Sequence, residues 1–277
     1  MDRKHDDLFY SLTQCKDSEI DLGLGALLIA KDAYPGLDTS TYMEQLDRMA
    51  LEVRDQIGEA TNPGRQIAQL NHYLFAEKSF KGNKDDYYNP QNSYLNDVLE
   101  RKLGIPITLS VVYIETSKRI GLPIVGVGFP GHFIVKHKGE YLETYIDPFH
   151  DGRILSDDAM LEQLETVFQQ PTPLKPEFLR QTSNREILAR ILRNLKQIHF
   201  REKAYTRAVA ACERISSLFP DLAQEHHDLG YLYYKTGAYG KSLKSFEEYL
   251  RIAGNAPDRE DIEENIELLR KQVARFN

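Results

Sequence analysis

The residues of this sequence that are best suited to chemistry lie between positions 129 and 151. His132 begins a short segment rich in Val, Ile and Phe, and Asp147 directly follows another segment of that kind. A histidine beside a carboxylate can move a proton in catalysis, because the carboxylate fixes the tautomer and orientation of the imidazole. A His–Asp hydrogen bond between adjacent strands can equally be a cross-link without a catalytic role. Both interpretations stay open at this point.

Metal binding is a third interpretation of the same region. His132, Asp147 and His150 would be the ligands, with Asp151 as a fourth. Their spacing matches no familiar ligand motif, and Asp151 followed by glycine is typical of an ordinary turn. We therefore expect no metal ion and no other cofactor. His72, on a predicted helix, is expected to be a packed or surface histidine.

Composition excludes several classes of protein. The 277 residues are 41% hydrophobic, enough for packed cores, and 35 basic against 42 acidic residues give a net charge of -7. No Lys/Arg block is long enough to track a phosphate backbone, so we do not expect a nucleic-acid partner. The first ten residues are charged, and the apolar runs at 24–30 and 105–113 are far below the ~20 residues of a membrane span.

The cysteines point to a reducing compartment. Cys15 and Cys212 are the two cysteines of the chain, too few for a disulfide framework and too far apart for a thiolate metal motif. We expect a cytoplasmic protein without a signal peptide, in which both thiols are structural.

Helices are predicted in the first hundred residues, and a sheet after them. The helices span 19–33, 40–57, 66–78 and 92–102, separated by Pro-Gly and Asn-Pro-Gly breakers. Asn89 or Asn92 is expected to cap the fourth helix, and Gly104 to end it. Helical spacing predicts a buried helix over 106–120, where Pro106 suits the first position.

Short segments rich in Val, Ile, Phe and Tyr follow at 124–129, 132–136 and 141–146. They predict consecutive antiparallel strands. A helix is expected over 156–168, and three prolines between 171 and 176 indicate a domain boundary.

The last third of the chain matches itself at an offset of 34 residues. The matched pairs include Ala189/Ala223, Leu195/Leu229, Ile198/Leu232, Tyr205/Tyr239, Ala208/Ser242 and Leu218/Ile252. This period is typical of tetratricopeptide repeats, in which a small residue allows two helices to approach closely. Two pairs depart from the match: Lys196 stands opposite Gly230, and Cys212 opposite Phe246. His226 occupies the position that is often Trp.

We predict two repeats, residues 189–222 and 223–256, and a capping helix, residues 258–276, that carries one apolar stripe. Two repeats bury little core, so they are expected to pack on the preceding domain. The repeats can bind a protein or peptide partner or merely stabilise the fold. The sequence predicts no oligomeric state.

Three ordered runs, at residues 92–110, 129–133 and 145–149, closely resemble the transglutaminase-like core of a bacterial family of the invasion-regulator B type. That family also carries C-terminal tetratricopeptide repeats, and a similar core occurs in an F-box protein of animals. The resemblance covers most of the chain and implies an α+β fold. It places a helical part at 1–104 and a papain/transglutaminase-like core with a short antiparallel sheet at 105–155. Together these form a domain at 1–170, followed by a linker at 171–183 and an all-α repeat domain at 184–277.

The resemblance also implies roles for single residues. The wider superfamily resembles papain in its Cys-His-Asp arrangement, and His132 and Asp147 fall at the His and Asp positions. The cysteine of that arrangement opens a buried helix, whose dipole favours a thiolate. This chain has Pro106 there. Slipping the alignment by one turn offers Thr108 or Ser110, although Ser110 is expected to hydrogen-bond to the preceding turn.

Four further residues are candidates for the wall of the same cleft. Asn92 and Asn96 are expected to line it near Pro106, or to serve as a helix cap and a buried hydrogen bond. Tyr87 and Tyr88 are expected to form a cleft wall or an anchor under a loop.

Two functions follow. The favoured one is a binding or regulatory scaffold that lacks the nucleophile and contacts a protein or peptide partner, because losing the attacking atom removes most of the rate of a covalent enzyme. The alternative is a hydrolase or acyl-transfer enzyme that uses His132 and Asp147 with water, Ser110 or Thr108 as the attacking group.

Overall fold

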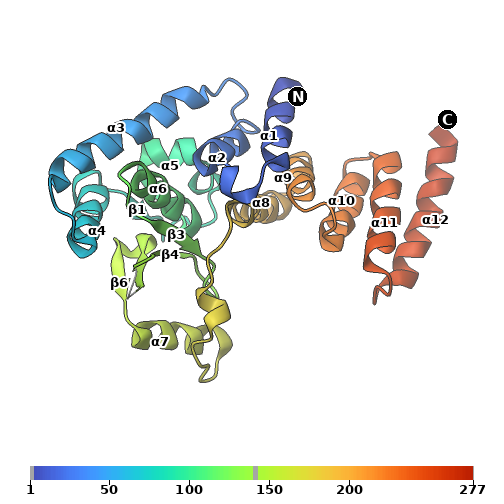
Figure 1. Ribbon diagram of the computed structural model, residues 1–277. Coiled ribbons are helices and arrows are strands. Elements are labelled where there is room, and N and C mark those ends of the chain that lie inside the picture. The colour runs from blue at the N-terminus through green and yellow to red at the C-terminus, as the bar shows by residue number, and fades with distance from the viewer. Residues whose placement is uncertain (1–2, 140–142, 277) are drawn as a thin grey trace. The chain divides into compact units, whose positions relative to one another are not determined.

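The protein is described from a computed structural model that covers residues 3–139 and 143–276. Its contacts divide the chain into two compact units, Met1–Ile191 and Leu192–Asn277. The first unit combines helices with a small sheet and the second is helical (Figure 1). The predicted α+β class with a C-terminal helical repeat region is confirmed.

The first unit begins with helices, and its longer strands follow one another after α6. Its helices are α1 Arg3–Gln14, α2 Leu22–Ala30, α3 Thr39–Ile57, α4 Pro63–Asn71, α5 Leu95–Arg101, α6 Pro106–Arg119 and α7 Asp157–Phe168. Its strands are β1 Lys81–Gly82, β2 Leu103–Gly104, β3 Ile124–Val127, β4 Ile134–His137, β5 Thr144–Asp147 and β6 Arg153–Leu155. A π-helical turn, His72–Glu77, extends α4, and short 3₁₀ turns lie at Asp17–Glu19, Pro90–Asn92, Pro148–His150 and Pro176–Leu179.

Helix α6 is the centre of the first unit. All of its residues from Pro106 to Ser117 are buried. It packs against α2, α3 and α5, and also against β3 and β4 (Figure 1). Proline at the first helical position costs no hydrogen bond, because that N–H has no partner within a helix. The predicted buried helix is therefore present, and it also contacts the 3₁₀ turn Pro148–His150.

The sheet is a four-stranded antiparallel meander in the order β3-β4-β5-β6. The register pairs Val127 with Ile134 and Val135 with Ile146. The three predicted strands are present, although Tyr141 and Leu142 of the third prediction lie outside the described residues. The prediction missed β6, because three residues after a turn are too few to show a period of two.

The predicted ends of α5 are wrong. Asn89 caps the 3₁₀ turn Pro90–Asn92 instead, accepting a hydrogen bond from the backbone N–H of Gln91 at 2.9 Å. The helix ends at Lys102, which has a φ of 61°, and Gly104 belongs to β2. The ammonium of Lys102 donates to the carbonyl of Leu99 and lies 4.5 Å from the centre of the Phe80 ring. These contacts stabilise a left-handed conformation that usually favours glycine.

The segment 171–183, predicted as a linker, pairs with β3 through Gln181 and Thr182 near its end. The backbone N–H of Thr182 donates to the carbonyl of Gly126 at 2.8 Å, and the hydroxyl of Thr182 accepts from the N–H of Gly128 at 2.8 Å. The division by contacts falls later, between Ile191 and Leu192. The domain limits given by the sequence remain a prediction.

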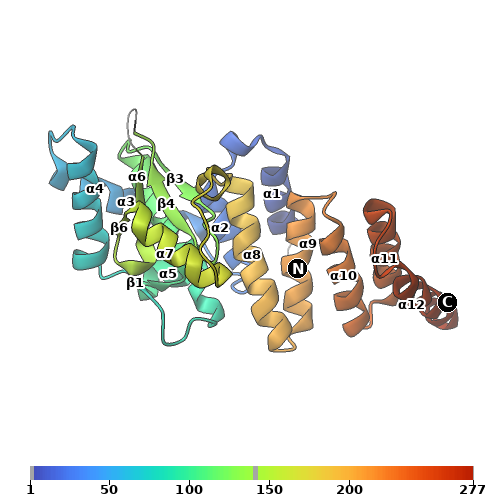
Figure 2. The same ribbon diagram turned by 90° about the horizontal axis from the view of Figure 1, so that it is seen from below.

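The second unit consists of successive helices that pack on their neighbours in chain order. They are the end of α8 Asn184–Arg201, then α9 Tyr205–Leu218, α10 Ala223–Lys235, α11 Tyr239–Ala253 and α12 Arg259–Phe276. Figure 2 shows α9 to α12 side by side. A Cβ atom on Gly230 would lie 2.5 Å from the ring of Phe246, so the close approach of α10 and α11 requires glycine there. Helix α12 contributes Ile262, Ile266 and Leu269 to a core shared with α11.

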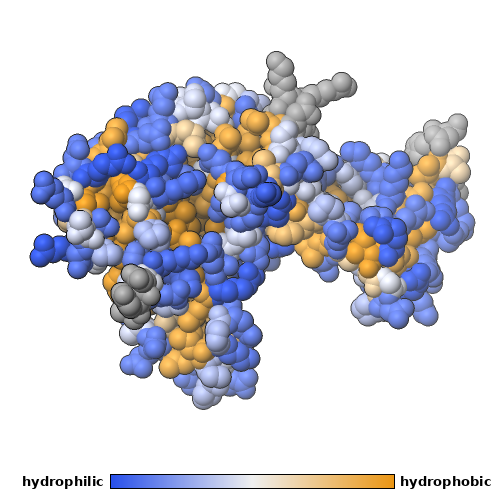
Figure 3. Space-filling model, viewed as in Figure 1, coloured by the Kyte–Doolittle hydropathy of each residue, from blue (hydrophilic) through white to orange (hydrophobic). Residues whose placement is uncertain are grey.

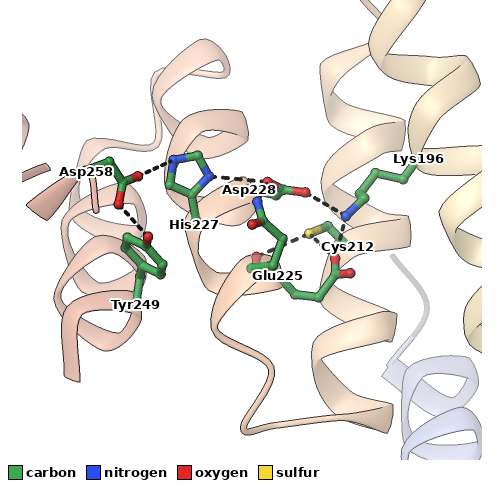
Figure 4. Close-up of polar contacts among 8 residues, drawn as sticks. Lys196, Cys212, Glu225, His227, Asp228, Tyr249 and Asp258 are labelled. Carbon is green, nitrogen blue, oxygen red and sulfur yellow. Dashed lines mark hydrogen bonds and ion pairs between the residues drawn. The ribbon is translucent and has the colours of Figure 1, made fainter. Parts of the chain in front are cut away.

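The two departures from the repeat pattern lie together in the first repeat. Lys196 places its ammonium 2.5 Å from Oε2 of Glu225 and 2.7 Å from Oδ2 of Asp228 (Figure 4). The buried Cys212 lies beside this cluster, with Sγ 3.4 Å from the Glu225 carboxylate. The second repeat packs glycine against phenylalanine at these positions, whereas the first combines a long lysine with a small cysteine. In each repeat, one large and one small side chain therefore occupy this pair of positions.

The polar cluster continues into the second repeat. His227 lies between two carboxylates, with Nδ1 3.3 Å from Asp228 and Nε2 3.6 Å from Asp258 (Figure 4). Tyr249 donates a 2.5 Å hydrogen bond to Asp258. Burial opposes the charge on Asp228, but hydrogen bonds from His227 and Lys196 outweigh it and lower the pKa of Asp228 to about 2.

Acid should therefore weaken the second unit through Asp228. A carboxyl group with a lowered folded-state pKa stabilises the fold above its unfolded value of about 4, and this stability is lost as the pH falls towards about 2. Between pH 5 and pH 2.5 we expect protonation of Asp228 to lower the free energy of unfolding of this unit by about 1 to 2 kcal/mol. Urea unfolding of Asp228→Asn, followed by hydrogen exchange in residues 192–277, should show a smaller loss over the same interval. An equal loss in both proteins would contradict this origin.

The face shown in Figure 3 mixes hydrophilic and hydrophobic side chains. One hydrophobic patch lies over the lobe of α7, where Leu161, Val167 and Phe168 are exposed. Among the described residues, no helix has both the length and the apolar character needed to cross a membrane.

Candidate active site

His132 and Asp147, fifteen residues apart, form a hydrogen-bonded pair. A turn in which the N–H of His132 donates to the carbonyl of Phe129 at 2.9 Å holds the histidine just before β4. Asp147 ends β5. The antiparallel pairing of β4 and β5 brings the side chains together, with Nε2 of His132 2.9 Å from Oδ2 of Asp147. Both side chains are buried.

His150 binds the same carboxylate oxygen. Its Nδ1 lies 2.7 Å from Oδ2 of Asp147, and its side chain is 45% exposed. The other oxygen, Oδ1, accepts the backbone N–H of Phe149 at 3.0 Å. The Asp147 carboxylate thus accepts three hydrogen bonds and anchors the 3₁₀ turn that follows β5.

These contacts fix the charge and tautomer of the pair. Burial tends to raise the pKa of Asp147, but the hydrogen bonds and charges of His132 and His150 hold it below its usual value. Asp147 is therefore ionised and can only accept hydrogen bonds. Nε2 of His132 must then carry hydrogen, which leaves Nδ1 of a neutral ring as an acceptor. That tautomer suits a general base.

The residues at the start of α6 offer no attacking group to this histidine. Pro106 is buried at the first helical position. The hydroxyl of Thr108 donates to the carbonyl of Asn92 at 2.6 Å and accepts the N–H of Ile105 at 3.1 Å. Among the described residues, the His132 ring forms its only hydrogen bond with Asp147.

The buried hydroxyl of Ser110 has no hydrogen-bond partner among the described residues, so the bond predicted to the preceding turn is not formed. A buried polar group without a partner costs about 1–3 kcal/mol. We expect Ser110→Ala to raise the free energy of unfolding by about 1 kcal/mol, measured by urea unfolding. A decrease in the free energy of unfolding would show instead that the hydroxyl has a hydrogen-bond partner.

The residues predicted to line the cleft differ in how close they lie to the His132–Asp147 pair. The side chain of Asn92 donates to the carbonyls of Asp86 and Tyr87 at 2.7 and 3.2 Å, which holds the preceding loop. Asn96 is buried, and its Oδ1 has no partner within the described part of the chain. Tyr87 lies nearer the pair, because its ring meets Phe149 edge-on at 6.1 Å and Phe149 meets His132 at 6.1 Å.

Tyr88 and the remaining candidates contact residues outside the His132–Asp147 pair. Tyr88 packs edge-on against Tyr87 with the ring centres 5.3 Å apart and is largely exposed. His72 is exposed and lies 3.3 Å from Glu77. Cys15 is a free thiol 3.6 Å from the carbonyl of Ser11, and burial raises the pKa of Cys212 well above its usual value, which makes that thiol unreactive.

Residues distant in the sequence hold the loop that carries Asp147 and His150. A Cβ atom on Gly82 would lie 2.5 Å from the carbonyl oxygen of Phe149, so β1 and the loop are in close contact. Asn71 donates to the carbonyl of Gly152 at 2.8 Å and accepts from the hydroxyl of Tyr113 at 2.9 Å. These supports could not be predicted from the sequence, because nothing local marks a contact between residues 71 and 152.

Arg190 supports the other member of the pair. Its guanidinium donates to the carbonyl oxygen of His132 at 3.0 Å and lies 5.5 Å from the centre of the Phe133 ring. The sequence carries no signal for this contact either, since 58 residues separate the two partners.

A buried central helix, a small antiparallel sheet and a His–Asp pair across two of its strands define a transglutaminase-like core. The sequence model of the Transglutaminase-like superfamily matches residues 40–193, and a tetratricopeptide-repeat model matches residues 195–267. The chain belongs to the transglutaminase-like superfamily, as the resemblance predicted.

The relatives include bacterial and animal proteins. The chain is 35% identical to a UPF0162 protein of Xylella fastidiosa strain Temecula1 over 88% of each chain. It is 24% identical to a UPF0162 protein of Vibrio cholerae, over 88% of this chain and 91% of that one. It is also 27% identical to F-box only protein 21 of Mus musculus, over 74% of this chain but 32% of the mouse protein.

Proposed function

We propose that the protein is a transglutaminase-like scaffold without a catalytic nucleophile, which binds and regulates a protein partner. The observation that carries the proposal is Pro106, buried at the first position of α6, where the resemblance expects the attacking cysteine. Proline has no side-chain group that can form a covalent intermediate. Removing one member of a catalytic set that acts as a unit removes most of its rate.

The alternatives to a cysteine give little support to catalysis. Thr108 uses its hydroxyl to join the start of α6 to the carbonyl of Asn92, and Ser110 lies fully buried inside the helix. A hydroxyl has a far higher pKa than a thiol, so it needs a base in hydrogen-bond contact to attack. Neither side chain has that contact with His132 among the described residues.

The second unit offers a surface of the kind that binds proteins. Phe200, Tyr231 and Tyr234 are exposed, and the rings of Phe200 and Tyr231 lie 5.8 Å apart. Tyr205 contacts Phe200, and Tyr239 contacts Tyr234. We call these five residues the aromatic cluster. Tyrosine and other aromatic residues are enriched among those that dominate binding energy at protein interfaces, and tetratricopeptide repeats generally mediate protein–protein contacts.

Partner capture by the full chain tests the proposal. We expect the double substitution Phe200→Ser with Tyr231→Ser to lose the specific partner. Leu268→Ser, which also changes an exposed apolar residue but lies on α12, should retain it, and so should His132→Ala. Identical partner sets for the unmodified protein and the double variant would show that the aromatic cluster does not recruit the partner.

Part of the proposal is a cytoplasmic location, supported by Cys15 and Cys212, which are both free thiols. A hydrolase that activates water remains the second candidate. One observation supports it. Nε2 of His132 donates its hydrogen to Asp147, so Nδ1 carries a lone pair that can accept a proton from water.

A further inference from the structure

We infer that His132, Asp147 and His150 form a binding site for one divalent transition-metal ion, with Zn²⁺ as the representative ion. Nε2 of His132, Oδ2 of Asp147 and Nδ1 of His150 all lie within 4.8 Å of one another. This site is independent of the proposed scaffold role, because it involves none of the residues of the aromatic cluster. The sequence offers the same three residues as ligands, but their spacing follows no known motif, and on that ground no metal ion is expected from the sequence alone.

The donor set fits such an ion. Two imidazole nitrogens and one carboxylate oxygen are ligands that Zn²⁺ accepts, and three protein ligands leave a coordination position open. The same set suits Fe²⁺, whereas Ca²⁺ and Mg²⁺ prefer oxygen ligands. The side chain of His150 is 45% exposed, so an ion can enter from the side of this residue and the open position can face solvent.

The ligand atoms have to rearrange before they can surround an ion. Tetrahedral zinc bonds of about 2.0–2.1 Å place neighbouring ligand atoms about 3.3 Å apart, whereas the two nitrogens now lie 2.9 and 2.7 Å from the Asp147 oxygen. Each nitrogen therefore has to move about half an ångström away from the oxygen, and the two nitrogens, which lie within 4.8 Å of each other, have to come to a similar separation of about 3.3 Å. Both imidazoles stay neutral: the hydrogen on Nε2 of His132 moves through solvent to Nδ1, and that on Nδ1 of His150 moves to Nε2.

The surrounding residues position the ligands in advance. The backbone N–H of Phe149 holds Oδ1 of Asp147 at 3.0 Å, which leaves Oδ2 for the ion. The N–H of Gly152 donates to the carbonyl of Asp147 at 3.0 Å, and Asn71 holds the carbonyl of Gly152. Partners of this outer kind orient ligands and raise the affinity of metal sites.

Calorimetric titration with Zn²⁺ tests the site in the full, tag-free chain after EDTA treatment and dialysis. We expect one ion per chain. Loss of an outer partner costs about 10–100-fold in affinity, so loss of the ligand in His150→Ala should cost more than about 100-fold. The matched control is His72→Ala, which removes another exposed histidine of the first unit and should bind as the unmodified protein does.

Binding by His132→Gln should fall in the same way, with circular dichroism confirming that the variant is folded. Co²⁺ gives a second readout, since a tetrahedral nitrogen–oxygen site produces visible absorption bands that His150→Ala should lose. Absence of saturable Zn²⁺ binding, or equal affinity in His150→Ala and the unmodified protein, would overturn the assignment. The result is separable from partner capture, in which the site residues are not needed.

Discussion

Replacement of Lys196 by Met is expected to lower the free energy of unfolding of the second unit by about 3–5 kcal/mol. The ammonium of Lys196 is largely buried and neutralises Glu225 and Asp228 at 2.5 and 2.7 Å. The side chain of Glu225 is 3% exposed. Without the lysine, two carboxylates face each other in a poorly solvated place. Arg193, 3.5 Å from Glu225, offsets part of the loss, and so does His227, 3.3 Å from Asp228.

The measurement is urea unfolding, with hydrogen exchange in residues 192–277 to assign the loss to this unit. Lys244→Met is the matched control, because Lys244 is exposed on α11 and should change stability by less than about 0.5 kcal/mol. If both variants lose the same small amount, the cluster around Lys196 does not hold the repeats together.

Asp147→Ala should be the most damaging single substitution tested in the first unit, with an expected loss of about 3–5 kcal/mol. The change leaves His132, His150 and the N–H of Phe149 without their common acceptor. Asp147→Asn keeps one acceptor oxygen and nearly the same volume, so its loss should be smaller, about 1–3 kcal/mol.

Both variants are compared with the unmodified protein by urea unfolding in the presence of EDTA, which removes any contribution from bound metal. Asp55→Ala, at an exposed position of α3, serves as the control and should stay within about 0.5 kcal/mol of the unmodified protein. A similar value for Asp147→Ala would mean that the carboxylate does not organise the loop.

The sequence predicted the elements whose period is long enough to see. The apolar pattern of residues 106–120, of residues 156–168 and of the 34-residue repeat persists over several helical turns. The structure contains helices in all three places. The ends of α5 were wrong because side-chain contacts decided them: Lys102 adopts the left-handed conformation with support from Phe80 and Leu99. No local preference of lysine indicates this.

The two departures in the repeat show how much a pattern can reveal without explaining it. The offset comparison detected Lys196 opposite Gly230 and Cys212 opposite Phe246 as separate exceptions. Only the structure shows that they are one exchange, in which a lysine and a cysteine replace a glycine and a phenylalanine beside the carboxylates of α10. Comparing repeats shows where a residue differs in size or charge, but not which residues it contacts in the folded protein.

The candidate site was predictable to a similar extent. The resemblance identified His132 and Asp147, and strand pairing brings them together. The bond from His150 depends on the 3₁₀ turn after β5, which folds the side chain back onto Asp147. The contacts of Asn71 and Arg190 join residues 81 and 58 positions apart. No spacing rule covers such pairs, so they could not be predicted from one sequence.

A panel of amide and ester substrates, with rates compared between the unmodified protein and His132→Ala, tests most directly whether the site lacks catalysis. For the metal-free protein, measured with EDTA, the account predicts equal rates at the level of the uncatalysed reaction, because no attacking side chain contacts His132 among the described residues. Hydrolysis above that level by the unmodified protein, lost in His132→Ala while its stability and partner binding persist, would contradict the account and establish a water-activating hydrolase.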